Sequence, residues 1–151
     1  YGGKITTHRA LAENALDRLV HHFEGVGPPW TREAPLPGGD LGDRGLAGLI
    51  DDLTDVAPFL DSRTVRRLAR SYGSKAHRIV QGATRPQDLG EDFGAGLTSA
   101  EVYYLVAHEW AQTAEDILWR RSKLGLHMSP RELARCNAAF GAAPEVASVG
   151  Q

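Results

Sequence analysis

Residues 62–80 read SRTVRRLARSYGSKAHRIV, and their apolar side chains recur at steps of three and four residues. This is the spacing of one face of an α-helix, and Gly73 in the middle predicts a break between two helices. We expect Asp61 or Ser62 to cap the first helix, because a side-chain oxygen there accepts a hydrogen bond from an unpaired backbone amide. The inward positions are Val65, Leu68, Ala69 and Tyr72 before the break, and Ala76, Ile79 and Val80 after it.

The same periodicity predicts helices on both sides of this stretch. One covers residues 7–23 with a stop at Gly25, and another ends before Pro58, because proline disfavours helical geometry in the residue before it. Residues 84–97 have the composition of a loop, and no strand pattern of useful length appears. The sequence therefore predicts an all-α, multi-helix bundle. Its longest helix starts at Thr98, with a buried stripe of Val102, Leu105, Val106, Trp110, Thr113, Ile117 and Leu118.

Two pairs of residues have the spacing of a capping box, in which each side chain bonds the exposed amide of the other residue. They are Thr98 with Glu101 and Ser129 with Glu132. Pro130 fits the first position of the helix after Ser129, where its missing N–H costs nothing. The two pairs predict that helices begin just after Thr98 and Ser129.

The composition indicates a soluble globular domain without an overall attraction to polyanions. The 151 residues are 42% hydrophobic and 24% charged, with a formal net charge of -2, so no nucleic-acid partner is expected. The single cysteine, Cys136, excludes an intrachain disulfide and is interpreted as a small helix residue. No apolar run reaches the roughly 18 residues that span a bilayer. Because the chain starts at Tyr1 and its only methionine is Met128, we expect its true beginning to lie upstream.

A local cluster of positive charge offers an alternative function. Cations accompany the helix–glycine–helix pattern of residues 62–80, as they do in helix-turn-helix DNA-binding motifs. However, a glycine between two helices is common in helical domains, and no basic arm or dimer heptad accompanies it. DNA binding therefore stays the weaker alternative. The cations are Arg66, Arg67, Arg70, Lys75 and Arg78.

The segment HEWAQTAED, residues 108–116, does not form a zinc-protease motif. That motif needs a second histidine four residues after the first, and Gln112 stands there instead. We expect no metal site. Asp116 and Arg120 lie four residues apart, which predicts an ion pair on the helix surface. The next stretch, residues 117–128, is interpreted as a core helix with a basic rim, with a membrane-surface helix as the alternative.

The stretch GGKITT, residues 2–7, combines three features that favour an anion. Gly2 and Gly3 permit close approach of the backbone, the helix start offers unpaired amides, and Lys4 adds a full positive charge. A P-loop is unlikely on its own pattern, because its hydroxyl residue directly follows the lysine and Ile5 stands there. The alternative is a strand-to-helix turn with a solvated lysine.

Four stretches of the sequence are familiar when read together: YGGKITTHRALAENAL, PPWTREAPLPGGD, RLARSYG and DLGEDFGAGLTSAEVYYLVAHEWAQTAEDILWRRSKLGL. They resemble the C-terminal region of the FAD-dependent, aerobic glycerol-3-phosphate dehydrogenases. The resemblance extends from Tyr1 as far as Phe140. One departure is His8, where the family commonly has tyrosine.

The resemblance implies how the chain is divided. Residues 1–24 are expected to be the end of an FAD-binding domain, a turn plus its closing helix. Residues 25–42 form a Pro- and Gly-rich linker that carries Trp30. Residues 43–145 form a helical C-terminal domain, and residues 146–151 are a tail.

The resemblance also implies a reaction. The full-length protein is expected to oxidise sn-glycerol 3-phosphate to dihydroxyacetone phosphate, with hydride transfer to FAD and electrons passed to quinone. Carried over residue by residue, Gly3, Lys4, Ile5 and Thr6 contact the flavin, and Lys4 also lies near the substrate phosphate. No catalytic residue is assigned to this chain, so by itself it is expected neither to retain FAD nor to turn over substrate.

The implied partners are the upstream FAD-binding domain, glycerol 3-phosphate and quinone. The implied location of the full-length enzyme is cytoplasmic, peripheral on the cytoplasmic face of the inner membrane. Whether the helical domain forms a homodimer, meets the membrane surface or acts purely as an interaction module stays open.

Overall fold

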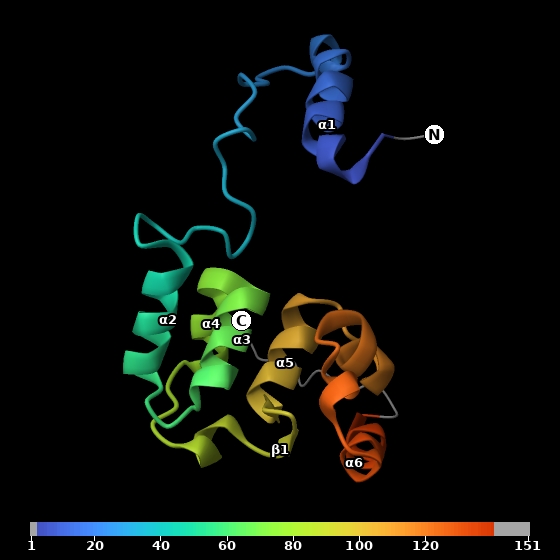
Figure 1. Cartoon of the computed structure of the whole chain (residues 1–151). Coiled ribbons are helices and arrows are strands. Elements are labelled where there is room, and N and C mark those ends of the chain that lie inside the picture. Colours follow the sequence, from blue (N-terminus) through green and yellow to red (C-terminus); the bar gives the residue numbers. More distant parts are fainter. Residues whose placement is uncertain (1–2, 141–151) are drawn as a thin grey trace. The chain divides into compact units, whose positions relative to one another are not determined.

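A computed structural model describes residues 3–140 of the chain. The chain forms two compact units that divide between Leu36 and Pro37. This division falls inside the Pro- and Gly-rich segment 25–42 (Figure 1). The expected end of the helical domain at residue 145 and the tail 146–151 lie outside the described residues.

The N-terminal unit contains one α-helix between two short 3₁₀ turns. Helix α1 covers His8–Asp17, preceded by η1 (Ile5–Thr7) and followed by η2 (Val20–His22). The prediction of one continuous helix over residues 7–23 is therefore wrong. After α1 the amide of Leu19 bonds the carbonyl of Leu16, three residues back, so the chain tightens into 3₁₀ geometry.

Helix α1 is not buried by its own unit. None of its residues is buried. Four large apolar side chains along it and just after it are 49–58% exposed: Leu11, Leu16, Leu19 and Phe23. Because a ten-residue helix gains most of its stability by burying such a face, the unit has apolar surface to offer a partner.

The second unit is helical, which confirms the all-α prediction. Helix α2 packs on α3, and α4 packs on α5 (Figure 1). The α-helices of this unit are α2 (Gly45–Val56), α3 (Ser62–Tyr72), α4 (Ala76–Val80), α5 (Ser99–His108) and α6 (Pro130–Phe140). Shorter helical turns are η3 (Gly73–Lys75), η4 (Pro86–Leu89), η5 (Asp116–Arg121) and η6 (Leu124–His127).

One hydrophobic core joins these helices. The side chains predicted to point inward from residues 62–80 all lie in it, including Val65, Ala76 and Val80 at 1% exposure or less. The predicted cap is also confirmed, because the Asp61 carboxylate accepts hydrogen bonds from the amides of Arg63 (2.9 Å) and Thr64 (3.0 Å). Cys136 is buried on α6, as expected for a small helix residue.

Two glycines hold the start of the second unit against the end of α3. Gly73 and Gly38 both have positive φ, and the amide of Ser74 donates to the Gly38 carbonyl at 3.0 Å. A Cβ on Gly73 would lie 1.9 Å from that carbonyl oxygen. Only glycine permits this contact between the two backbone segments.

Residues 84–97 are more ordered than the predicted loop. They contain η4 and most of a short antiparallel hairpin of β1 (Asp92–Gly94) and β2 (Leu97–Thr98). Phe93 and Leu97 from this hairpin are buried in the core. The expectation of no strand is thus corrected. Strands of three and two residues are too short to show the alternation by which a strand is recognised.

The predicted long helix from Thr98 to Leu118 is interrupted. Helix α5 ends at His108, Trp110 has φ 55°, and the helical path resumes before η5, a π-helical segment. Trp110, expected in the buried stripe, is 85% exposed. The predicted helix is interrupted because a new helical segment starts just after Thr113. Thr113 and Asp116 bond each other's backbone amides, which is a capping box inside the predicted helix.

Of the two predicted capping boxes, one is present. The Glu132 carboxylate accepts from the amide and hydroxyl of Ser129, both at 2.7 Å, at the start of α6. Thr98 makes no side-chain cap at the start of α5. The predicted cap is absent because Glu101 is engaged elsewhere, in the protein interior, but the helix does begin just after Thr98, at Ser99.

Candidate functional site

The four residues predicted to contact flavin form the entrance to the N-terminal helix. Lys4 is the cap of η1 in an extended conformation, and its carbonyl accepts from both the amide and the hydroxyl of Thr7 at 2.9 Å. Gly3, Lys4, Ile5 and Thr6 are all exposed, with Ile5 at 82%. The structure thus brings these residues together in one open turn.

This turn presents positive potential without an internal counter-charge. Lys4 forms no ion pair among residues 3–140. Amides in the first turn of a helix have no partner within it, so those of Ile5 and Thr6 add partial positive charge beside the lysine. A Cβ on Gly3 would lie 3.0 Å from the Thr7 hydroxyl, so the glycine keeps the turn compact. The donor set suits an electron-rich ring edge or a phosphate.

A largely buried ion pair joins α3 to α5 in the second unit. The carboxylate of Glu101, 1% exposed, accepts hydrogen bonds from Arg67 at 2.6 and 2.7 Å and from the Tyr72 hydroxyl at 2.6 Å. Arg67 also donates to the carbonyl of Gly96 at 2.8 Å. The arrangement ties α3, α5 and the hairpin together. The sequence predicted Arg67 on a basic surface and Glu101 in a cap, and the structure corrects both.

The electrostatics of this group follow from burial and from the shared carboxylate. Burial raises the pKa of Tyr72, and the charge and hydrogen bond of Glu101 raise it further, well above its usual range. Burial lowers the pKa of Arg67, but its hydrogen bonds and attraction to Glu101 outweigh this and the pKa rises. Arg67 therefore stays cationic and Tyr72 stays neutral in the fold.

A polar cavity of about 510 Å³ opens beside this ion pair. Its lining mixes carboxylates with cations, so the cavity favours neither sign of ligand charge. Arg67 Nε is the one buried side-chain nitrogen or oxygen without a partner in the described part of the chain. The lining residues are Asp61, Arg63, Thr64, Arg67, Asp92, Ala95, Gly96, Leu124 and His127.

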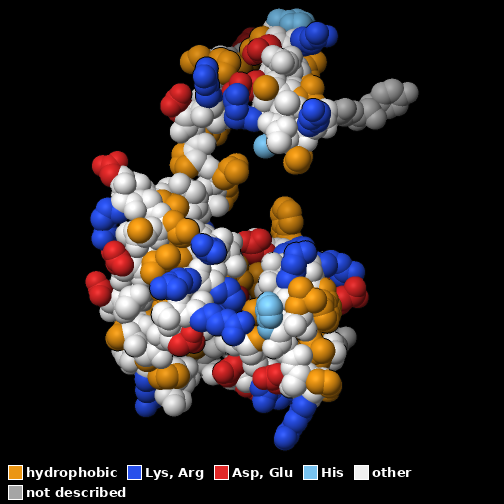
Figure 2. Space-filling model, in the orientation of Figure 1, with side chains coloured by type: hydrophobic (Ala, Val, Ile, Leu, Met, Phe, Trp, Pro, Cys, Tyr) orange, Lys and Arg blue, Asp and Glu red, His pale blue; other side chains and the backbone are white. Residues whose placement is uncertain are grey.

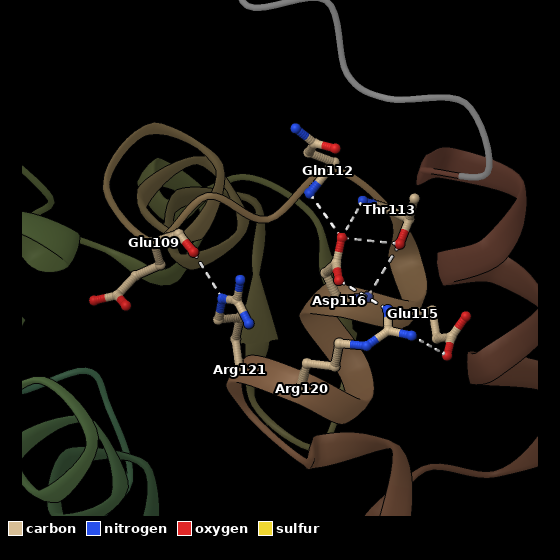
Figure 3. Close-up of polar contacts among 7 residues, drawn as sticks. All are labelled: Glu109, Gln112, Thr113, Glu115, Asp116, Arg120 and Arg121. Atoms are coloured by element: carbon tan, nitrogen blue, oxygen red, sulfur yellow. Dashed lines mark hydrogen bonds and ion pairs between the residues drawn. The ribbon is translucent and has the colours of Figure 1, made fainter. Parts of the chain in front are cut away.

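The loop between α5 and η5 is held by polar contacts (Figure 3). The Asp116 carboxylate accepts from the amides of Gln112 (3.0 Å) and Thr113 (3.1 Å), and Arg120 donates to it at 2.9 Å, the predicted pair. The Gln112 amide contributes most to lowering the pKa of Asp116 to about 2, followed by Arg120.

One of the five cations of the alternative DNA-binding surface, Arg67, is not available to DNA. Lysines and arginines gather over α3 and α4 in the face shown in Figure 2, but Arg67 is committed to Glu101. Helix α3 buries its apolar side against the core. The glycine between α3 and α4 serves the contact with Gly38, so a turn for DNA reading is not needed to explain it.

Two further findings concern metal ligands and membrane-spanning helices among residues 3–140. No group of three or more potential metal-ligating side chains occurs among them. None of their helices combines the length and apolar character that crossing a membrane requires.

Comparison with known proteins places the chain in a family. Residues 29–149 match the model of the C-terminal domain of alpha-glycerophosphate oxidase. Similar relatives, each aligned over 89% of this chain, are glycerol-3-phosphate dehydrogenase of Pseudomonas aeruginosa (49% identical), aerobic glycerol-3-phosphate dehydrogenase of Escherichia coli K12 (44%) and D-erythritol 1-phosphate dehydrogenase of Brucella abortus (45%). The alignments cover 26–27% of those relatives, so the chain spans about a quarter of their length. The chain belongs to the family of C-terminal domains of alpha-glycerophosphate oxidase.

Proposed function

We propose that this chain is the C-terminal part of a flavoenzyme that oxidises sn-glycerol 3-phosphate to dihydroxyacetone phosphate and passes the electrons to quinone. The single observation that carries the proposal is the 44–49% identity to two glycerol-3-phosphate dehydrogenases over 89% of the chain. The open turn at Lys4 supports it, because a substrate phosphate and a reduced flavin are both anionic.

Within this proposal each part of the turn has a role. FAD, when bound, supplies the acceptor for the hydride removed from the substrate. The amides of Ile5 and Thr6 stabilise negative charge at the cofactor, because they are already oriented before the charge develops. Lys4 binds the substrate phosphate through its ammonium group. The catalytic base belongs to the rest of the enzyme.

We also propose that the exposed apolar side chains along α1 pack against the upstream FAD-binding domain. Leu11 and Phe23 are about half exposed. Burying such side chains on folding is worth about 1.5–3 kcal/mol each when they are fully covered. The upstream domain is the natural partner, since α1 follows it directly in the polypeptide under this proposal. We further propose, from the resemblance alone, that the full-length enzyme lies on the cytoplasmic face of the inner membrane.

A relative that acts on D-erythritol 1-phosphate bears on the choice of substrate. Its identity of 45% lies between the 44% and 49% of the two glycerol-3-phosphate dehydrogenases, so similarity in this region does not separate the two substrates. Both substrates are phosphate monoesters of a polyol. The turn at Lys4 binds the part that they share.

The test uses the full-length protein, purified with its flavin. We expect reduction of an artificial dye with glycerol 3-phosphate, and a lower kcat/KM with D-erythritol 1-phosphate. A higher kcat/KM with D-erythritol 1-phosphate would make that ester the substrate in place of glycerol 3-phosphate. A purified protein without flavin would contradict the proposal.

A deletion distinguishes two possible roles of the helical unit, membrane docking and structural support of the enzyme. Removing residues 43–151 from the full-length protein and losing only the quinone-linked rate would assign the unit to membrane docking. Loss of the dye-linked rate as well would assign it to structure. Retention of both rates would contradict either role.

A further inference from the structure

Trp110 stands out among the side chains that the proposed reaction does not use. It is 85% exposed, the largest exposure of any described aromatic residue. Its φ of 55° is one that a bulky L-residue rarely adopts. The chain gains almost no buried apolar area from this residue, yet it tolerates the strained conformation.

The backbone on either side of Trp110 is fixed by hydrogen bonds to helix α5 and to η5. The amides of Glu109 and Ala111 both donate to the carbonyl of Leu105, at 3.0 and 3.1 Å. Arg121 donates from Nε to the carbonyl of Glu109 at 2.7 Å (Figure 3). Trp110 therefore lies between two residues whose positions are set by hydrogen bonds.

The backbone further along the loop is fixed as well. Ala111 and Ala114 are buried at 2% and 3% exposure, and the Asp116 carboxylate holds the two amides between them. An exposed tryptophan on such a rigid frame loses little conformational entropy when a partner covers it. Buried tryptophans are also the residues that most often dominate the binding energy of an interface.

The charge around Trp110 does not match a membrane surface. Between residues 109 and 121 there are three carboxylates, Glu109, Glu115 and Asp116, and two arginines, giving a local net charge of -1. Both arginines are also engaged, Arg120 with Glu115 and Asp116, and Arg121 with the Glu109 carbonyl. Anionic lipid is attracted by a net excess of cations, whereas residues 109–121 carry a net negative charge.

The remaining three quarters of the relatives' length lies outside the region aligned with this chain. A domain joined by a linker of about 20 residues reaches its neighbour at millimolar effective concentration, so a small interface is sufficient to keep it docked. Tyr103, 56% exposed on α5, and the partly buried Val106 add apolar area before Trp110.

We propose that Trp110 is the anchor by which the helical unit docks onto the upstream part of the same polypeptide. The receiving surface is an apolar pocket with a hydrogen-bond acceptor for the indole N–H. The inference rests on the proposed function only in taking this chain as the C-terminal part of a longer flavoenzyme.

The experiment is oxidative footprinting of the full-length protein, in which mass spectrometry measures the rate of modification at Trp110. We expect Trp110, which is 85% exposed in this chain, to react at least tenfold more slowly in the native full-length protein than in the denatured protein. Leu126, 70% exposed on η6, is the matched control and is expected to react at the rate of an exposed side chain. Replacement of Trp110 by Ala should then raise the modification of Tyr103 at least threefold.

Three results would overturn the inference. A fast reaction at Trp110 would show that the residue lies in solvent. Protection that grows with protein concentration would show that a second copy covers it, and protection only with added lipid vesicles would show that a membrane covers it. None of these readouts depends on turnover. An active, flavin-loaded enzyme with a reactive Trp110 would refute the docking inference and leave the proposed function intact.

Discussion

Glu101 on α5 and Arg67 on α3, 34 residues apart in sequence, form a two-pronged ion pair in the core of the helical unit. Each oxygen of the Glu101 carboxylate accepts a hydrogen bond from one guanidinium nitrogen of Arg67, and Glu101 is 1% exposed. A pair of this geometry fixes how the two helices meet, because a shift of one turn would leave both charges buried without partners.

Replacing Glu101 with Gln should therefore destabilise the protein strongly. The change removes the counter-charge of Arg67, whose side chain is 19% exposed, and breaking a buried pair of this kind costs up to about 3–5 kcal/mol. Urea unfolding measures the loss. The control is Glu91→Gln on the exposed pair with Arg135, which should cost less than about 1 kcal/mol. Equal losses for the two variants would show that the buried pair has no special weight.

Gly73→Ala should destabilise the protein by about 2 kcal/mol or more, because the new Cβ meets the Gly38 carbonyl oxygen at 1.9 Å and φ is positive. Gly82→Ala is the matched control. Its φ is 78°, but nothing lies within 4 Å of the added Cβ, so only the backbone strain of about 1 kcal/mol is expected. If thermal unfolding gives the two variants the same midpoint, the contact between Gly73 and Gly38 is not tight.

The pH dependence of stability has a contribution from Asp116. Hydrogen bonds from Gln112 and Arg120 lower its pKa to about 2, below the 3.8 of an unperturbed aspartate. The carboxylate therefore stabilises the fold fully above pH 4, and this contribution disappears as the pH falls from about 4 to about 2. Urea midpoints of the wild type and Asp116→Asn should differ at pH 6 and converge near pH 2. A constant difference over this range would contradict the assignment, and Asp55→Asn, at an exposed position on α2, is the control.

Trp110→Gly should stabilise the chain, measured by urea unfolding, by about 0.5–1 kcal/mol. Glycine adopts positive φ without the penalty of about 1–2 kcal/mol that an L-residue bears there, and an 85% exposed side chain has little burial to lose. Lys123→Gly, at φ 56° and exposed, should behave in the same way. A clear loss of stability in the tryptophan variant alone would mean that its ring packs within the helical unit.

Periodicity alone was enough to predict the buried face of α3. Val65, Leu68 and Ala69 are buried as expected because one apolar stripe on α3 has only one way to face inward. Asp61 was recognisable as a cap for the same local reason, since its partners are the next amides along the chain.

Features that depend on distant residues were not predicted. Nothing near Glu101 in sequence indicates that Arg67 will reach it across 34 residues, so its local spacing with Thr98 suggested a cap instead. The break at Trp110 had a visible signal, because Thr113 and Asp116 have the capping spacing, but the apolar stripe that continues to Leu118 obscured it. The turn at Lys4 was predicted to favour an anion from its own glycines, amides and lysine, and its contact with flavin is expected from the resemblance alone.

The binding of substrate phosphate by Lys4 is tested most directly in the full-length enzyme. The measurement is the dissociation constant of glycerol 3-phosphate, read from the flavin absorbance, in Lys4→Met and in the control Lys123→Met. Loss of one charged hydrogen bond, about 1.5–3 kcal/mol, should weaken binding about tenfold or more in Lys4→Met and leave Lys123→Met unchanged. A flavin-loaded Lys4→Met enzyme that binds glycerol 3-phosphate as tightly as the wild type would contradict the account.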